Sequence, residues 1–184
     1  MSQNLRNFTQ AVFAFDAVVQ RMPSDKWDAP TPCEEWNAKE LVEHQCAVLN
    51  GVATIAQTGQ MARPTPSPES DDPVATWTVC RENVLSSLDR HGVLSQVGPF
   101  WFGAADVDGL VAAVQWDPMT HAWDLAQAGG IDHGLDEGLV QSTMSIVEPQ
   151  IGMLSETGRT QPSIVAVDDS SPLNRYLALV GRTA

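Results

Sequence analysis

Hydrophobic residues recur every three or four positions along most of the chain, which is the period of an amphipathic helix. In residues 4–20 this spacing places on one face Leu5, Phe8, Val12, Phe15 and Val19. A second stripe contains Leu41, Val42, Val48, Leu49, Val52 and Ile55. We therefore expect two long helices that each bury one face.

Polar residues and prolines mark where helices begin. Asn37 and Glu40 have the spacing of a capping box, with Asn in place of the usual Ser or Thr. Asp72 followed by Pro73 is typical of a helix start, because a proline at the first helical position loses no backbone hydrogen bond. We expect this third helix to run to about residue 90.

The second half of the chain carries further helical patterns. A helix expected over residues 106–128 is followed by Gly129 and Gly130, which suit a C-terminal cap. The remaining expected elements are a fifth helix over residues 136–152, a strand-like run at 163–167 and a short apolar helix at 172–181.

Three stretches lack a helical pattern. Residues 22–36 are rich in proline and tryptophan and are expected to form an ordered loop packed over the helices. Residues 59–73 are rich in Pro, Ser and Asp and should form a surface connection. Residues 92–105 are short, aromatic and bounded by glycines, which is typical of a loop or one irregular strand.

The order of these elements selects a fold class. Regular alternation of strands and helices is missing, so helices must pack on helices, and we expect an all-α bundle with an appended tail. We expect a single domain over residues 1–184, with the regular bundle at about 3–152 and the tail at 153–184.

Composition and charge exclude several classes of function. The chain is 43% hydrophobic, and no stretch approaches the roughly 20 apolar residues of a membrane-spanning helix. The first residues lack the pattern of a secretory signal, so we expect a cytoplasmic protein. The net charge of −13, with scattered basic residues, disfavours nucleic acid and anionic membranes as partners. The odd number and wide spacing of the cysteines indicate reduced structural thiols, at Cys33, Cys46 and Cys80.

Three ionisable residues continue the apolar stripe of the helix expected at 106–128. They are Asp117, His121 and Asp124. Asp117 and His121 are one helical turn apart, so their side chains can converge on one point. His44 interrupts the stripe of the second helix in the same way. The sequence thus places ionisable groups from two helices toward the core.

Ionisable groups that face a core must be paired, hydrogen-bonded or bound to a cation. One metal ion would satisfy His44, Asp117 and His121 together. Histidine nitrogens and a carboxylate suit a borderline divalent ion, zinc first, with nickel, iron or manganese behind it. Three protein ligands leave a position open for water or substrate, which is the pattern of a catalytic site.

Other interpretations of the same residues stay open at this point. A histidine on an apolar face is more often a satisfied core residue than a ligand, and the spacing DxxxH is common. Asp124 is expected to orient His121, the alternatives being a cap or a salt-bridge partner. Pro118 should kink the helix. Alternatively a new helix begins at Pro118 with Asp117 as its cap, which would weaken the assignment of Asp117.

The remaining histidines and aromatic residues are expected to have structural roles. His91 should end a helix and His133 should lie in a glycine-rich turn, so that both face solvent. The tryptophans and the FWF run at residues 100–102 are expected to form core and pocket wall.

Three segments together resemble a known family. They are WDAPTPCEEWNAKELVEH at residues 27–44, DPMTHAWDLAQAGG at 117–130 and PLNRYLALVGR at 172–182. The chain is similar to small actinobacterial proteins related to the mycothiol-dependent maleylpyruvate isomerase N-terminal domain, within the DinB-like superfamily. The resemblance spans residues 27–182, and its motifs are specific in combination.

The resemblance implies a DinB-like four-helix bundle, here with an additional short helix and a small C-terminal tail. It also implies a metal held by one histidine from the second helix and an acid-xxx-His pair from a later helix, which match His44, Asp117 and His121. The isomerase has a Glu where this chain has Asp117, a shorter arm that would reach the ion differently or through water. The isomerase also has a further C-terminal domain, so activity on maleylpyruvate does not follow.

These observations lead to one main hypothesis and two alternatives. The main hypothesis is an enzyme that depends on one divalent metal ion and acts as a thiol transferase or isomerase on a small electrophilic substrate. Its cosubstrate could be a low-molecular-weight thiol of the mycothiol type. The first alternative is a non-catalytic binding or regulatory protein that the metal stabilises, and the second is a tryptophan-lined pocket that needs no metal. The sequence assigns no catalytic residue, substrate or oligomeric state.

Overall fold

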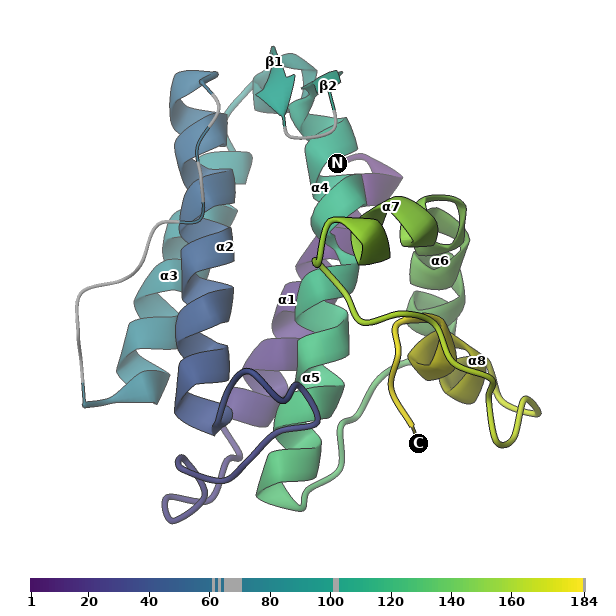
Figure 1. Cartoon of the computed structure of the whole chain (residues 1–184). Helices are drawn as coiled ribbons and strands as arrows, with labels where there is room; N and C mark the ends of the chain where they lie inside the picture. Colours follow the sequence, from purple (N-terminus) through teal and green to yellow (C-terminus); the bar gives the residue numbers. More distant parts are fainter. Residues whose placement is uncertain (61, 63, 65–70, 101–102, 184) are drawn as a thin grey trace.

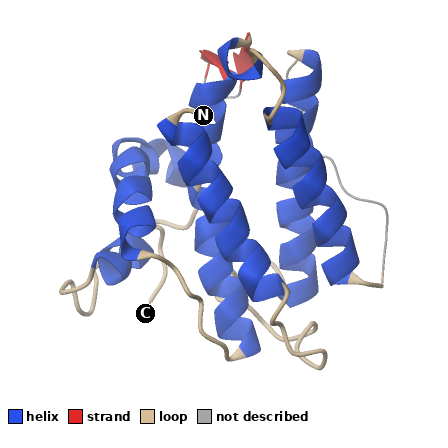
Figure 2. Ribbon diagram, turned by 180° about the vertical axis from the view of Figure 1, so that it is seen from behind, coloured by secondary structure: helices blue, strands red, loops and turns tan. Residues whose placement is uncertain are grey.

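The computed structural model describes residues 1–60, 62, 64, 71–100 and 103–183. Helices dominate the structure (Figures 1 and 2), which confirms the expected all-α bundle. The bundle consists of α1 (Gln3–Val19), α2 (Ala38–Thr58), α3 (Pro73–Leu88), α4 (Val107–Val114) and α5 (Trp116–Gly129). On one side of it lie α6 (Glu137–Val147), α7 (Ile151–Glu156) and α8 (Pro172–Leu179).

The main core lies between α1, α2, α3, α4 and α5. The apolar stripe expected for α1 is buried there, and so is most of the α2 stripe. Trp77 of α3 is fully buried against Phe15 of α1, with the ring centroids 4.6 Å apart. A second apolar cluster joins α5, α6 and α8, where the buried Tyr176 hydroxyl lies 2.6 Å from the Thr120 hydroxyl. The C-terminal helix is therefore packed against the helix that carries Asp117 and His121.

The expected helix starts are confirmed. The backbone N–H of Glu40 donates to the Asn37 side chain, and the backbone N–H of Asn37 donates to the Glu40 carboxylate. Asp72 accepts from the backbone N–H of Ala75 and caps α3, with Pro73 in the first turn. These caps fix where α2 and α3 begin.

The helix expected over residues 106–128 is two helices. The structure ends α4 at Val114 and begins α5 at Trp116. Pro118 causes the break, because it has no N–H to donate to the Val114 carbonyl and its ring would clash with that oxygen. The alternative with Asp117 as a cap is also wrong, since Asp117 lies within the first turn of α5. Asp117 therefore keeps its one-turn spacing to His121.

Proline also interrupts the helix expected over residues 136–152. It consists of α6, a 3-10 turn at Glu148–Gln150 that contains Pro149, and α7, which extends to Glu156. The physical reason is the same as at Pro118, because Pro149 cannot donate a backbone hydrogen bond within a continuous helix.

Two expectations about strands are corrected. Residues 92–105, expected to hold at most one irregular strand, contain a 3-10 turn at Val93–Ser95 and the antiparallel pair β1 (Val97–Phe100) and β2 (Gly103–Asp106). Residues 163–167 form no strand, because they run beside α8, where the backbone N–H of Ile164 donates to Ala178.

The ordered loop expected at residues 22–36 is confirmed, and it packs on the bundle. The Thr31 hydroxyl lies 2.9 Å from the Cys33 carbonyl and 2.8 Å from the Trp36 carbonyl, which holds the loop compact. The surface connection expected at 59–73 falls mostly outside the described residues. In the described part of the chain, every helix is too short or too polar to cross a bilayer.

Candidate metal centre

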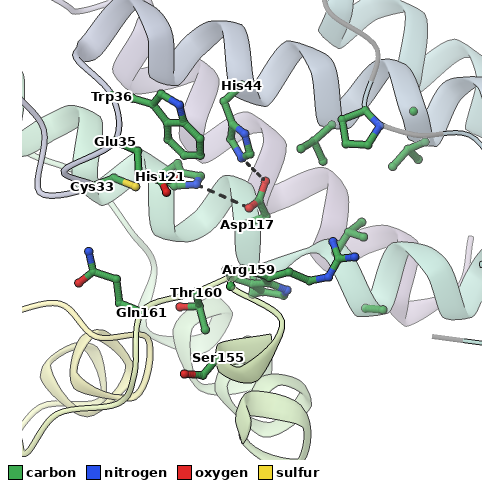
Figure 3. Close-up of a pocket in the computed structure, with 18 of the residues that line it drawn as sticks. Cys33, Glu35, Trp36, His44, Asp117, His121, Ser155, Arg159, Thr160 and Gln161 are labelled. Carbon is green, nitrogen blue, oxygen red and sulfur yellow. Dashed lines mark ion pairs between the residues drawn. The ribbon is translucent and has the colours of Figure 1, made fainter. Parts of the chain in front are cut away.

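Helices α2 and α5 bring His44, Asp117 and His121 together at one point (Figure 3). Nε2 of His44 lies 3.5 Å from one Asp117 carboxylate oxygen, and Nε2 of His121 lies 3.6 Å from the other. One ligand atom from each of the three residues lies within 4.8 Å of the other two. The sequence could place His44 only on a helix face, whereas the fold places it beside the Asp117–His121 pair.

These separations suit a shared cation better than direct hydrogen bonds. Donor atoms bound tetrahedrally at about 2.1 Å from a zinc ion lie about 3.4 Å from one another. Nε2 of His44 is buried and finds no hydrogen-bond partner among the described residues. A buried polar atom without a partner is costly, and a bound ion would satisfy it. The donor set therefore fits a divalent metal ion.

Neighbouring side chains hold the three residues in place. The indole of Trp36 stacks on the His44 ring, with centroids 4.1 Å apart and planes at 21°. The side-chain amide of the fully buried Gln45 donates to Asp117 at 2.6 Å. The rings of His44 and His121 meet edge to face, with centroids 5.1 Å apart. The donors are thus oriented before any ion binds.

The Asp117 carboxylate dominates the electrostatics of the group. Burial alone would raise the pKa of Asp117, but His44, His121 and the Gln45 amide outweigh burial and hold that pKa at about 2. Burial alone would lower the pKa of His44, but the neighbouring Asp117 carboxylate outweighs it and the pKa is raised. Asp117 is therefore ionised at neutral pH and can act as an anionic ligand.

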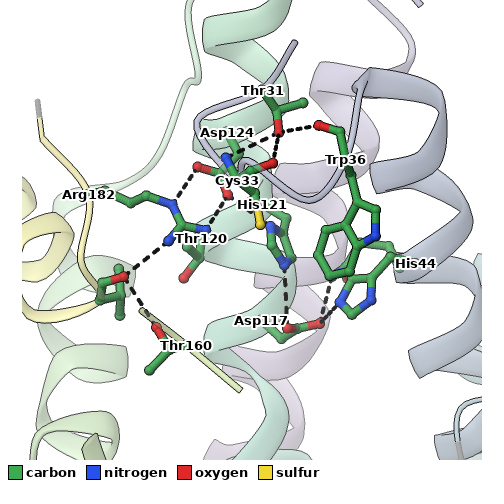
Figure 4. A network of polar contacts seen from close by, with 12 residues as sticks. Thr31, Cys33, Trp36, His44, Asp117, Thr120, His121, Asp124, Thr160 and Arg182 are labelled. Carbon is green, nitrogen blue, oxygen red and sulfur yellow. Dashed lines mark hydrogen bonds and ion pairs between the residues drawn. The ribbon is translucent and has the colours of Figure 1, made fainter. Parts of the chain in front are cut away.

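Asp124 orients His121 from the other side of the ring (Figure 4). Nδ1 of His121 donates to Asp124 at 2.9 Å, which leaves Nε2 for the side of the ring that faces Asp117. Asp124 is fully buried, and its two oxygens also accept from Arg182 at 2.9 and 3.0 Å. Of the roles considered for Asp124, the structure shows the salt bridge, with Arg182, and it also shows the contact with His121 that an orienting role requires.

Cys33, His121 and Asp124 form a second group with ligand atoms close enough to share an ion. Both oxygens of Asp124 are already held by Arg182 and His121. Burial raises the pKa of the Cys33 thiol, which disfavours the thiolate that a metal requires. The group of His44, Asp117 and His121 is the better metal site.

The group lines a cavity of about 730 Å³. Trp36 and Trp116 form part of its wall, as expected for pocket tryptophans. The loop before α2, the helices α2, α4 and α5, and the segment that follows α7 also contribute to the wall. Trp77 and Trp123 belong to the core. Residues 101 and 102 of the FWF run lie outside the described residues.

Sequence reasoning missed two cavity residues and misjudged one histidine. Cys33 was expected to be mainly structural, yet it lines the cavity. Arg182 was not singled out, because nothing in the residues around it indicates a buried partner 58 positions away. His91 is exposed as expected, whereas His133 is only half-buried and accepts from the backbone N–H of Leu135. Neither histidine lines the cavity. Cys46 is buried in the main core, outside the site.

Comparisons with known proteins agree with the geometry. Residues 8–126, more than half of the chain, match the family described as the mycothiol maleylpyruvate isomerase N-terminal domain. The chain is also 27% identical over 140 residues to an uncharacterized protein of Mycobacterium tuberculosis strain CDC 1551 / Oshkosh, and equally to one of strain ATCC 25618 / H37Rv. The aligned region covers 76% of this chain and 74% of each relative.

Proposed function

Because the chain belongs to the mycothiol maleylpyruvate isomerase N-terminal domain family, we propose that it is a divalent-metal-dependent enzyme that transfers a low-molecular-weight thiol to a small electrophilic substrate or isomerises it. The observation that carries the proposal is the convergence of His44, Asp117 and His121 in the wall of the cavity. The family gives the class of chemistry, and the cavity provides room for both a thiol and a substrate.

His44, Asp117 and His121 would hold the ion, with zinc as the first choice for two nitrogens and one carboxylate oxygen. When bound, a divalent ion lowers the pKa of a bound thiol or water and so provides a nucleophile near neutral pH. Asp124 and Arg182 keep Nε2 of His121 directed toward the other donors. Trp36 covers one face of His44 and restricts water on that side. These residues bind and orient, and the substrate would enter beside them.

The first experiment is elemental analysis of protein purified without added metal or chelator. We expect about one divalent ion per chain, and we expect His44→Ala and His121→Ala to lose it. His91→Ala is the matched control, because His91 is exposed and outside the cavity. If both site variants kept the full metal content of the wild type, the proposed site would be wrong. Thiol consumption in the presence of an electrophile, measured with and without metal, then tests turnover.

A second function is favoured by the origin of the three donors. They come from two helices that lie side by side, so a bound ion would pin α2 to α5 even without turnover. A non-catalytic, metal-stabilised protein would show a large rise in melting temperature with metal. It would show no thiol consumption with any electrophile. The enzyme hypothesis requires both the rise in melting temperature with metal and the consumption of thiol.

A further inference from the structure

The cavity continues well beyond the three metal-site residues, between α2 and α4. We call this part the apolar arm and define it by Val48, Val52 and Ile55 of α2 and Leu110, Ala113 and Val114 of α4. Every one of these side chains is aliphatic. The charged residues that line the cavity come from other segments, namely the loop before α2, α5 and the C-terminal part of the chain. The walls that α2 and α4 give the arm are therefore aliphatic, while the guanidinium of Arg159, from the segment after α7, extends toward the same side of the cavity (Figure 3).

The arm is long as well as apolar. Val48 lies one helical turn beyond His44, and Ile55 lies seven residues further along α2. At a rise of about 1.5 Å per residue the arm extends about 10 Å, the length of an extended chain of about eight carbons. On α4, Val114 and then Leu110 lie at increasing distance along the chain from Asp117. The two helices thus form a slot that leads away from the metal site.

Water fills such a slot poorly, because aliphatic walls offer it no hydrogen bonds. A short, highly charged substrate would leave most of the arm unfilled, and along α2 and α4 its charge would lie against aliphatic side chains. An apolar chain would instead displace the water and bury its own surface. The shape and chemistry of the arm therefore select the part of the ligand that the metal site does not contact.

We propose that the electrophilic substrate carries an unbranched apolar tail of about six to eight carbons, which occupies the apolar arm while the reactive end lies beside His44, Asp117 and His121. This inference rests on the proposed function for the reactive end, and on the cavity alone for the tail. It names a substrate class, an alkyl or alkenyl electrophile, that differs from the maleylpyruvate in the family's name.

A homologous series of hydroxamates tests the arm on the zinc-loaded protein. The hydroxamate group chelates the ion, and the alkyl tail is lengthened from two carbons to eight. We expect affinity, measured by calorimetry, to rise about threefold to fourfold per methylene. If acetohydroxamate binds but longer tails do not increase the affinity, the inference is overturned and the proposed metal site stays intact.

Two variants separate the arm from a general affinity for apolar compounds. Ala113→Leu adds a side chain to the wall of the arm, and we expect it to abolish the gain from hexyl and octyl tails while acetohydroxamate binds as in the wild type. Ala112→Leu is the matched control, because Ala112 is the neighbour of Ala113 on α4 and does not line the cavity. If both variants lost the gain in affinity from hexyl and octyl tails equally, the assignment of the tail to the arm would be contradicted.

A second series needs no metal. Binding of 1-butanol, 1-hexanol and 1-octanol to chelator-treated protein should show a similar gain per methylene and the same sensitivity to Ala113→Leu. If alcohols show the gain but no hydroxamate binds, the arm stands and the proposed metal chemistry fails. If neither series gains affinity with length, the inference is wrong whatever the metal content.

Discussion

Nδ1 of His121 lies 2.9 Å from a carboxylate oxygen of Asp124, and this contact determines which nitrogen of the ring faces Asp117. Asp124 is itself held by Arg182 through two hydrogen bonds. The orientation of a metal-site histidine on α5 therefore depends on a residue that follows α8.

Replacement of Arg182 should weaken metal binding although Arg182 is not a ligand. Without the guanidinium, the buried Asp124 carboxylate loses its fixed position, and we expect Arg182→Gln to reduce zinc affinity about 10- to 100-fold in calorimetry. Arg182→Lys keeps the charge but loses the paired hydrogen bonds, so its zinc affinity should lie between those of the wild type and Arg182→Gln.

Tyr176→Phe is the control for Arg182, because it removes another buried contact between α8 and α5 without touching Asp124. It should lower the free energy of unfolding by about 1 kcal/mol and leave zinc affinity unchanged. Nitrogen chemical shifts of the His121 ring in metal-free protein give a readout of the tautomer. An unchanged tautomer in Arg182→Gln would show that Arg182 only stabilises the fold.

Asp117 and Asp124 should differ in how directly they act on the metal. Asp117→Asn removes the anionic donor itself, whereas Asp124→Asn weakens only the orientation of His121. We expect zinc affinity to fall further in Asp117→Asn, because loss of an orienting partner costs about 10- to 100-fold and loss of a ligand costs more. The reverse order would favour the second group, which contains Cys33 and Asp124.

A cobalt-substituted sample tests whether the open coordination position accepts a thiol. Sulfur that enters the coordination sphere adds a charge-transfer band to the visible and near-ultraviolet spectrum. The apparent affinity should increase as pH rises toward about 8.5, because the thiolate is the ligand. A spectrum that no thiol alters, while a bound water still titrates, would favour water activation or a structural metal.

In metal-free protein, the contribution of His44 and Asp117 to the free energy of unfolding should be largest at mildly acidic pH. The Asp117 pKa is held at about 2 against an ordinary 3.8, so its contribution is present above 3.8 and is lost as pH falls toward 2. The His44 pKa is raised above 6.5, so its contribution is complete below 6.5 and is lost as pH rises through the folded-state value.

Urea denaturation of chelator-treated protein across this pH range measures the effect. His44→Gln should remove the decline on the alkaline side and keep most of the fold. With zinc present the trend above pH 6.5 should reverse, because protons compete with the metal for His44. Metal-free protein whose stability rises between about pH 6 and 8 would contradict the coupling of the two residues.

The helices, and the faces on which the three residues of the candidate metal site lie, could be predicted from local sequence, because a helix repeats every 3.6 residues and the core selects one face. His44 stands out as an ionisable residue within an apolar stripe, and so does His121. The breaks at Pro118 and Pro149 were harder to place. Proline disrupts the turn that precedes it, and whether the axis only bends or one helix ends is decided by packing.

Contacts between distant segments were not predictable in this way. Arg182 meets Asp124 only because α8 packs on α5, and that packing depends on buried side chains such as Tyr176. The strand β2 was missed for a different reason. Its residues, Gly103–Asp106, include no β-branched or aromatic side chain, and pairing with β1 defines it instead.

The interruption between Val114 and Trp116 separates two tasks that one continuous helix would have combined. Asp117 and His121 lie on α5, whereas one of the two walls of the apolar arm lies on α4. Mutations that reshape residues 107–114 can therefore change ligand preference without altering the metal-site residues of α5. A mutant library confined to α4 is accordingly the starting point we would choose for evolving new substrate preferences in this protein.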